Sequence, residues 1–465
     1  MFMPDNTVFV PVKNINMVGE RTKNERLPMA ERLTTFQEVE HTYTTEQALL
    51  EASRCMGCPS RWCSKECPAG MPVPEFIKKI REEDYEGAYE LISSASPLPE
   101  FCSRLCPQEK QCQSNCTRSI RTEAVGIGRL ERFVVEQHYA SGAEEKVAPD
   151  TGKSIAVVGS GPSGLSAAVT LKKLGHAVTV IDANENPGGL LRYGIPNMKL
   201  EEGTLDRKID SMLQMGISFQ TGITVDAETL KKLQADYDAV VLSIGTGNAR
   251  KLALEADGIH YAVKYLSGEG SAEGKNVIII GGGDTGNDCV GTAIRQGAAS
   301  ITQIEMLPKV TKPQIIYSPL VAKPKEVKFD SSQEECLNKF LKDPHIYQAT
   351  VKAVSVDENG KLKSATVVSL EAVYDENRRL KMVEIPGSEK EYPCELLLIA
   401  AGFIGPKAES LGVDLTPRTN IAANGYKTSL DKVYACGDCR TGQSLVVKAM
   451  VDGRECAKAV DAALK

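Results

Sequence analysis

The sequence predicts an α/β protein in which a small helical domain precedes two domains built from alternating strands and helices. Two observations lead to this prediction. Residues 154–189 and residues 276–307 each read as strand, glycine-rich turn, helix and strand, so the same unit occurs twice. The first 145 residues lack this pattern and carry two groups of closely spaced cysteines instead. Each glycine-rich unit is expected to begin a parallel sheet with helices on its faces.

Length and composition limit the classes of function. The chain has 465 residues, enough for two to four domains, and 42% of them are hydrophobic. Its net charge of −6 argues against nucleic acid or an anionic membrane as the main partner. No segment approaches the roughly 18 consecutive apolar residues of a membrane span, and the first twenty residues do not resemble a secretory signal. We therefore expect a cytoplasmic protein with neither nucleic acid nor membrane as a partner.

The first domain is predicted over residues 1–145 and is expected to be helical. Residues 1–45 are polar and weakly patterned, as in an extended arm. Apolar side chains at helical spacing then predict short helices over 45–54, 73–96 and 127–139. Small and polar residues from 140 to 153 read as a linker.

The first glycine-rich turn has the pattern of a dinucleotide-binding site. Gly159 allows a tight turn, Gly161 lets the backbone approach a pyrophosphate, and Gly164 allows close packing of helix on strand. The pyrophosphate then lies at the N-terminus of the helix. Asp182 ends the second strand, where its carboxylate can accept from ribose hydroxyls. A merely tight turn is the alternative, but the strand, the helix and the acid favour a Rossmann-like domain.

The second unit repeats this pattern with Gly281, Gly283 and Gly286, and with Glu305 at the matching strand end. Two dinucleotide sites in one chain indicate a flavin site and a nicotinamide site. The C-terminal stretch "YACGDC", followed by an apolar helix, is typical of the end of an FAD domain. Gly437 and Asp438 lie within it, and Asp438 is expected to bond the ribityl–phosphate linker of FAD.

The FAD domain is therefore predicted to be discontinuous, with the nicotinamide domain inserted into it. The stretches "SIGTG" and "AAGF" are expected to join the two domains. The predicted order is a helical domain over 1–145, the first part of the FAD domain over 146–250, the NAD(P)H domain over 251–390 and the second part of the FAD domain over 391–465.

Cys436 and Cys439 form a CxxC pair, for which a redox disulfide is one interpretation. The pair brackets the Gly-Asp of the FAD motif, so we favour small side chains packed near a phosphate. Four further cysteines, at positions 289, 336, 394 and 456, are isolated in the sequence.

Eight cysteines fall into two groups in the first domain. The spacings are C-x2-C-x4-C-x3-C from Cys55 to Cys67 and C-x3-C-x5-C-x3-C from Cys102 to Cys116. In a reducing compartment such groups bind metal more often than they form disulfides. Zinc favours paired CxxC spacings, whereas short spacings with a trailing Cys-Pro are typical of ferredoxin-type clusters. Next to two dinucleotide sites, two 4Fe–4S clusters are the better interpretation, with zinc or free thiols as the alternative.

Five stretches carry a specific resemblance: "RCMGCPSRWCSKECP", "SGPSGLSAA", "NPGGLLRYGIPNMKL", "GGGDTGNDCVGTAIRQGA" and "ACGDCRTGQSLVVKAM". On these stretches, which span nearly the whole chain, it resembles the family of β (small) subunits of bacterial glutamate synthase. The wider family includes the N-terminal half of dihydropyrimidine dehydrogenase and the large subunit of NADH-dependent ferredoxin:NADP oxidoreductase. Residues 311–335 depart from the pattern, and their role is open.

The resemblance implies the ligands of the clusters and adds Gly189 to the cofactor-binding glycines. One cluster would be held by Cys55, Cys58, Cys63 and Cys116. The other would be held by Cys67, Cys106, Cys112 and a non-cysteine ligand from the following helix, a position that Glu131 matches. Cys102 would be spare. Counting along the chain would instead give four consecutive cysteines to each cluster.

The resemblance also implies the function. NAD(P)H would reduce FAD, and electrons would pass through the two clusters to the FMN of a glutamate synthase large (α) subunit, which forms glutamate. A second interpretation is a reductase subunit serving a related electron acceptor, of the ferredoxin:NADP oxidoreductase or dihydropyrimidine dehydrogenase type. A redox-sensing or scaffolding protein would leave two dinucleotide sites unexplained.

The choice between NADH and NADPH depends on Glu305. A carboxylate at that strand end bonds the ribose 2′-hydroxyl of NADH and repels the 2′-phosphate of NADPH. Many glutamate synthases of this type nevertheless use NADPH, so charge and resemblance point to different nucleotides. Charge alone predicts a slight preference for NADH.

Overall fold

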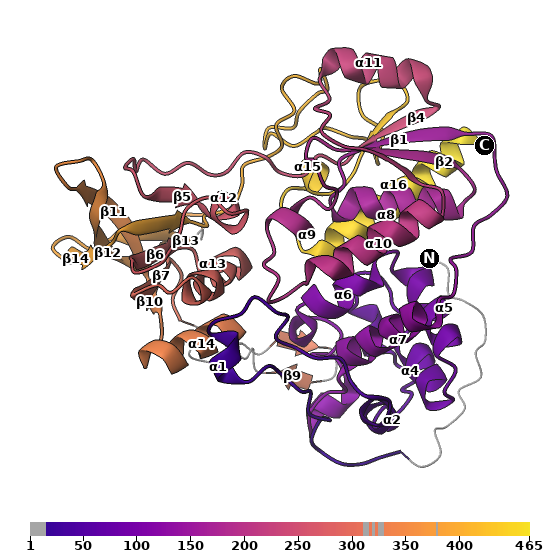
Figure 1. Ribbon diagram of the computed structural model, residues 1–465, viewed down its shortest axis with the longest axis horizontal. Coiled ribbons are helices and arrows are strands. Elements are labelled where there is room, and N and C mark those ends of the chain that lie inside the picture. Colours follow the sequence, from indigo (N-terminus) through magenta and orange to yellow (C-terminus); the bar gives the residue numbers. More distant parts are fainter. Residues whose placement is uncertain (1–14, 310–315, 319–320, 324–329, 378–379) are drawn as a thin grey trace.

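The computed structural model describes residues 15–309, 316–318, 321–323, 330–377 and 380–465. It consists of a helical N-terminal domain and two α/β domains, one inserted into the other (Figure 1). This arrangement confirms the predicted fold class. Within these ranges, none of the helices combines the length and the apolar character that crossing a bilayer requires.

The helical domain has one hydrophobic core, to which the apolar faces of α4, α5 and α7 contribute. In α4 the side chains of Val73, Phe76, Ile77 and Ile80 follow helical spacing and are all buried. They share this core with Leu130, Val134 and other residues of α7. The elements of this domain are α1 (Met29–Arg32), α2 (Thr45–Ser53), α3 (Trp62–Lys65), α4 (Val73–Arg81), α5 (Tyr85–Ala95), α6 (Pro99–Leu105) and α7 (Ile127–Ser141), with 3-10 turns at Gln108–Lys110 and Thr117–Ile120.

The first α/β domain has a five-stranded parallel sheet in the order β16-β4-β1-β2-β3. Its strands are β1 (Ser154–Val158), β2 (Ala177–Ile181), β3 (Ser218–Gln220), β4 (Ala239–Leu242) and β16 (Val433–Ala435). Its helices are α8 (Pro162–Lys173), α9 (Leu190–Tyr193), α10 (Glu202–Gln214), α11 (Ala227–Asp236), α15 (Asp438–Thr441) and α16 (Val446–Leu464). Helices α8, α10 and α16 lie between this sheet and the helical domain (Figure 1). The C-terminal helix therefore completes a domain that begins near residue 154.

The second α/β domain has its own parallel sheet, in the order β10-β7-β6-β15-β5. The strands are β5 (Ile259–Tyr261), β6 (Asn276–Ile280), β7 (Ser300–Glu305), β10 (His345–Tyr347) and β15 (Leu396–Ile399). Helices α12 (Ala262–Leu266), α13 (Asp284–Arg295) and α14 (Ser331–Phe340) share one hydrophobic core with this sheet. A second core joins the sheet to the antiparallel strands β11 (Ala349–Val356), β12 (Leu362–Tyr374), β13 (Leu380–Glu384) and β14 (Lys390–Pro393). A separate hairpin pairs β8 (Ile316–Ser318) with β9 (Val321–Lys323).

The chain returns to the first α/β domain later than the predicted boundary at 390/391. Strand β15 pairs with β5 and β6, so the inserted domain extends to residue 399. The reason is that β15 is a continuous apolar run, as buried parallel strands generally are. Such a run fits either parallel sheet, so the local sequence does not show which sheet it joins. The two connections between the domains then run antiparallel, with Ala249 bridging Phe403 and the Asn248 amide donating to the Gly405 carbonyl at 3.0 Å.

The N-terminal arm crosses from the helical domain to the inserted domain. Arg26 and Arg32 both pair with Glu334 of α14, at 3.1 and 3.2 Å. From the other side, the Arg295 side chain of α13 donates to the carbonyl of Thr35 at 2.8 Å. Figure 1 shows α1 beside α14, apart from α2, α4 and α5. The segment that the sequence predicts as an extended arm, in its described part from residue 15, is thus a tether between domains.

Residues 311–335, whose role the sequence left open, are only partly described. Residues 330–335 cap and begin α14, where the Asp330 side chain accepts from the Ser332 amide at 3.0 Å. Lys199 of the first α/β domain reaches Asp330 at 3.3 Å and Asp288 of α13 at 2.6 Å. This end of the segment therefore contributes to the contact between the two α/β domains. Apart from β8 and β9, the rest of the segment lies outside the described residues.

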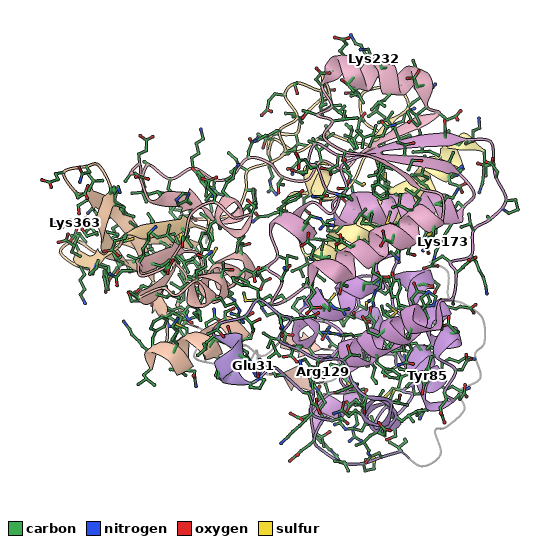
Figure 2. All side chains as sticks on the ribbon, in the orientation of Figure 1. Glu31, Tyr85, Arg129, Lys173, Lys232 and Lys363 are labelled. Atoms are coloured by element: carbon green, nitrogen blue, oxygen red, sulfur yellow. The ribbon has the colours of Figure 1, made fainter. Side chains whose placement is uncertain are left out.

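Ion pairs also join the helical domain to the first α/β domain. Lys173 of α8 pairs with Glu145 at 2.6 Å, and Figure 2 labels Lys173 at this border. Glu136 of α7 bonds Arg104 of α6 and Arg207 of α10, each at 2.8 Å. Burial opposes ionisation of Glu136, but hydrogen bonds from Arg207 and the charge of Arg104 outweigh it and hold its pKa at about 2.

Replacing Glu136 by glutamine is expected to lower the free energy of unfolding at pH 6 by roughly 2 kcal/mol. The folded-state pKa lies below the unfolded value, so this stability is present above about pH 5 and is lost as the pH falls toward 2. Urea unfolding of both proteins at pH 6 and pH 3 should therefore show a smaller difference at pH 3. Glu228→Gln, which removes an exposed partner of Lys232, is the control and should change little. A difference that grew on acidification would contradict the assignment.

Candidate functional site

The first glycine-rich turn is shaped by backbone contacts that exclude a side chain. Gly159 has a φ of +101°, and a Cβ there would lie 2.3 Å from the Ser243 carbonyl oxygen. A Cβ on Gly164 would lie 1.9 Å from the carbonyl oxygen of Gly159. At Gly161, which precedes α8, nothing lies within 4 Å of the Cβ position. The turn is therefore closed toward the protein and open at the helix N-terminus, as a pyrophosphate site requires.

Asp182 supports this turn directly. Its Oδ2 accepts from the Ser160 amide at 2.7 Å and from the Ser160 hydroxyl at 2.5 Å. Its Oδ1 accepts from the Asn184 amide at 2.8 Å. Only 6% of the residue is exposed, so its carboxylate is fixed at the end of β2, beside the glycine turn. Sequence reasoning assigned it to ribose and did not foresee these internal bonds.

The second turn repeats this geometry in the inserted domain. Gly281 has a φ of +125°, and its Cβ would lie 2.5 Å from the Ala400 carbonyl oxygen. A Cβ on Gly286 would lie 2.0 Å from the carbonyl oxygen of Gly281. Gly283 precedes α13 and has nothing within 4 Å of its Cβ position. Both predicted turns thus present an open second glycine at a helix N-terminus.

Glu305 has the same role in this turn as Asp182 has in the first. Its Oε2 accepts from the Gly282 amide at 3.0 Å, and its Oε1 accepts from the Leu307 amide at 2.8 Å. In each domain the acid therefore bonds the second residue of the glycine turn and the residue two positions after itself. Each Glu305 oxygen accepts one bond and keeps a lone pair for a ligand, whereas each Asp182 oxygen already accepts two bonds.

The remaining predicted FAD residues converge on α8. Gly189 has a φ of +52°, and its Cβ would lie 2.8 Å from the Gly161 Cα. Gly437 has a φ of +75°, and its Cβ would lie 2.2 Å from the Ser163 hydroxyl oxygen. Asp438 follows at the first position of α15, where it accepts from the Ser444 hydroxyl at 2.7 Å and burial raises its pKa. Segments far apart in the sequence thus meet at the N-terminal end of one helix.

Replacing Asp438 by alanine is expected to weaken FAD retention by about 1–3 kcal/mol, because a half-buried acceptor for the cofactor is removed. Flavin occupancy after extended dialysis measures the effect. Asp438→Asn keeps one acceptor oxygen and should fall between the wild type and Asp438→Ala. Unchanged occupancy in both variants would mean that FAD does not reach this residue.

Four thiols from both cysteine groups line one pocket of the helical domain. They belong to Cys55, Cys58, Cys63 and Cys116, with Trp62 and other apolar side chains around them. Burial raises the pKa of Cys55 to about 11 and that of Cys63 to about 12, the latter with the nearby charges of Cys116 and Cys55. Binding a metal would replace these protons. The grouping equals the ligand set implied for the first cluster.

The other predicted ligands also lie close together. Burial raises the pKa of Cys112 well above its usual range, and the nearby Cys67 and Glu131 raise it further. Glu131 itself is 7% exposed, and its Oε1 has no hydrogen-bond partner among the described residues. A buried oxygen without a partner is costly unless a ligand satisfies it. The chemistry of this set, three thiols and one free carboxylate oxygen, fits a cluster with one non-cysteine ligand.

Within the described ranges, no three His, Cys, Asp or Glu side chains converge as they would around a single ion. In a 4Fe–4S cluster each ligand binds a different iron, so the ligands stand further apart than around one metal. All fourteen cysteines are free thiols. The thiol of Cys439 is buried and contacts the carbonyl of Cys436 at 3.1 Å, so the CxxC pair has a packing role beside the FAD turn.

Two family models match the chain in the order of its domains. Residues 32–143 match the family described as dihydropyrimidine dehydrogenase domain II, 4Fe-4S cluster. Residues 153–453 match the pyridine nucleotide-disulphide oxidoreductase family. The second match covers well over half of the chain. The boundary between the two matches falls in the linker that precedes β1.

Curated relatives match nearly the whole chain. The small chain of glutamate synthase [NADPH] from Bacillus subtilis is 36% identical over 94% of this chain and 95% of its own length. The corresponding protein of Escherichia coli is 32% identical over 95% of this chain and 96% of its own length. Among solved structures, Mycobacterium tuberculosis FprA in complex with NADPH has a TM-score of 0.53 at 17% identity, covering 68% of this chain and 85% of that chain, a likeness of fold alone. Because full-length relatives and both domain families agree, the chain belongs to the family of glutamate synthase small subunits and to the pyridine nucleotide-disulphide oxidoreductases.

Proposed function

We propose that this chain is the electron-input subunit of a glutamate synthase. It oxidises NAD(P)H and passes the electrons through FAD and two 4Fe–4S clusters to the FMN of a glutamate-forming large (α) subunit. The names of the small-chain relatives support this role. In Schizosaccharomyces pombe the matching stretch is 22% of one long glutamate synthase [NADH], which supports a partner with the remaining activities. A dihydropyrimidine dehydrogenase name belongs to the family model of residues 32–143 alone, whereas the relatives that match nearly the whole chain favour glutamate synthase over a related type of acceptor.

The observation that carries the proposal is the order of the three sites. Cys67 and Cys106 pack against the core that contains Leu165 and Met450 of the first α/β domain. The first thiol set, which includes Cys63, packs within the helical domain, and Cys67 touches that core as well. The second set of ligands thus lies between the FAD domain and the first set. Such a series suits a protein that moves electrons away from its flavin.

The chain's own residues are assigned to the groups as follows. The first cluster would be held by Cys55, Cys58, Cys63 and Cys116, and the second by Cys67, Cys106, Cys112 and Glu131. FAD would lie on Gly159, Gly161, Gly164, Asp182, Gly189, Gly437 and Asp438, and NAD(P)H on Gly281, Gly283, Gly286 and Glu305. When bound, the flavin accepts a hydride and the clusters carry electrons singly. The protein's part is to hold phosphates at two helix N-termini and thiolates in two sets that are at least partly buried.

The test is anaerobic purification of the native complex, followed by addition of NAD(P)H. We expect an FMN-containing large subunit to copurify, and the visible flavin absorbance to bleach within the turnover time. A chain that copurifies with a different acceptor would support the alternative type of complex. A flavin that NAD(P)H does not reduce would contradict the electron-input role.

We propose NADH as the nucleotide, and this choice rests on the position of Glu305. Its carboxylate is fixed beside the second turn, where a 2′-phosphate would meet a negative charge. Relatives carry both names, NADPH in Bacillus subtilis and NADH in Schizosaccharomyces pombe. Steady-state reduction of an artificial acceptor by each nucleotide should favour NADH, and Glu305→Gln should narrow the difference. If NADPH is preferred by more than tenfold, about 1.4 kcal/mol, Glu305 does not face the 2′ position.

A further inference from the structure

The second set of ligands contains a thiol that the assignment leaves unused. Cys102 lies on α6 and Cys106 caps its C-terminal end one turn later, where the Cys106 amide donates to the Cys102 carbonyl at 3.1 Å. Residues four apart on a helix share a face, and the two thiols contact one another. Cys102 belongs to the core against which Cys67 and Cys106 pack. Five groups able to bind iron are therefore gathered where four are needed.

The Cys102 thiol is held only by weak contacts. Its sulfur lies 3.5 Å from the Ser96 hydroxyl and 3.6 Å from the Met450 sulfur of α16. Thiols and thioethers are weak hydrogen-bonding groups, so little hydrogen-bond energy opposes turning this side chain toward the cluster site. The residue is 4% exposed, which protects the thiol from competing reactions with solvent.

Glu131 is the weakest ligand of the set by chemistry. Iron–sulfur clusters are held by cysteine thiolates, and a carboxylate is a harder donor. Glu131 lies on α7, which packs against α6 and its Cys102, and the nearby Cys102 adds to the burial that raises the pKa of Glu131. A thiolate can therefore compete with this carboxylate for the same iron.

We propose that Cys102 is a reserve ligand that can replace Glu131 on the second cluster. The proposal rests on the proposed function, which assigns a cluster to this set. In the exchange the bond from iron to the Glu131 oxygen breaks and a bond from iron to the Cys102 sulfur forms. The thiol proton moves to the freed carboxylate, and no electron is transferred. The site thus keeps four protein ligands and its net charge.

The experiment compares iron content and low-temperature EPR spectra of the full chain after anaerobic purification. Wild type and Cys102→Ala should each hold about eight iron atoms per chain, as two 4Fe–4S clusters require. Glu131→Ala should also hold about eight, with a changed spectrum of one cluster. Glu131→Ala with Cys102→Ser should lose the second cluster or one of its irons, leaving about four to seven atoms.

The matched control is Glu131→Ala with Cys394→Ala, which removes a buried cysteine of the inserted domain instead. It should match Glu131→Ala alone, and thermal unfolding of every variant checks that the chain is folded. Loss of the second cluster in Glu131→Ala alone would overturn the proposal, as would full iron content in the variant that lacks both Glu131 and Cys102. Wild-type protein without iron would instead overturn the proposed function.

Discussion

Replacing Cys63 by alanine is expected to lower the iron content from about eight to about four atoms per chain. Cys63 is one of four thiols that line a single pocket, and the pocket draws on both cysteine groups. Losing one thiolate leaves an iron without its protein ligand, and the buried, largely apolar surroundings provide no substitute. The flavin should still bleach with NAD(P)H, because FAD and the nucleotide bind other domains. Transfer to the large subunit should fall by at least two orders of magnitude, since this set lies furthest from the FAD domain.

Cys289→Ala is the matched control, because that thiol is buried in α13 of the inserted domain, away from the pocket. It should keep all the iron. If the wild-type protein contained stoichiometric zinc and no iron, the helical domain would not be an electron-transfer domain. Iron content that Cys63→Ala leaves unchanged would show that the pocket is not a ligand set.

Alanine at Gly164 and alanine at Gly286 should have separable effects. In both, the new methyl group would meet a backbone carbonyl oxygen at 2.0 Å or less, so helix and turn must move apart. Gly164→Ala should abolish FAD retention. Gly286→Ala should keep FAD but weaken nicotinamide binding at least tenfold, about 1.4 kcal/mol. Flavin absorbance after dialysis and titration with a nonreactive nucleotide analogue measure the two effects.

Gly203→Ala is the control for both substitutions. Gly203 lies in the first turn of α10 with nothing within 4 Å of its Cβ position, so alanine there should change neither binding. If Gly286→Ala released FAD while Gly164→Ala retained it, the two dinucleotide domains would have been assigned in reverse.

Short sequence patterns predicted the features that depend on neighbouring residues, above all the two glycine turns. The glycine turns at 159–164 and 281–286 are tight and precede helices as expected, with a positive φ at Gly159 and Gly281. The grouping of cysteines is different, because Cys116 joins the set of Cys55 through tertiary packing. Counting along the chain separates these two thiols, and only the family resemblance placed them together.

Two further features could not be predicted from the sequence: the sheet that β15 joins, and the hydrogen bonds of Asp182 and Glu305. Strand β15 pairs with β5 and β6 of the inserted domain, and this pairing depends on tertiary structure that the apolar run alone does not reveal. The bonds from Asp182 and Glu305 to their own turns require distances that spacing alone does not supply. A possible signal was the matching position of the two acids, each ending the second strand of its unit.

The N-terminal tether has a mechanical consequence. Two antiparallel connections, near Asn248 and Gly405, form a hinge about which one α/β domain could rotate against the other. The tether attaches to the inserted domain at Glu334 and Arg295, away from that hinge line. The contacts of the tether lie off this line, so they oppose a rotation of the inserted domain, but each of them is a single half-exposed ion pair or hydrogen bond. The arm therefore favours the orientation of the two α/β domains seen here without fixing it.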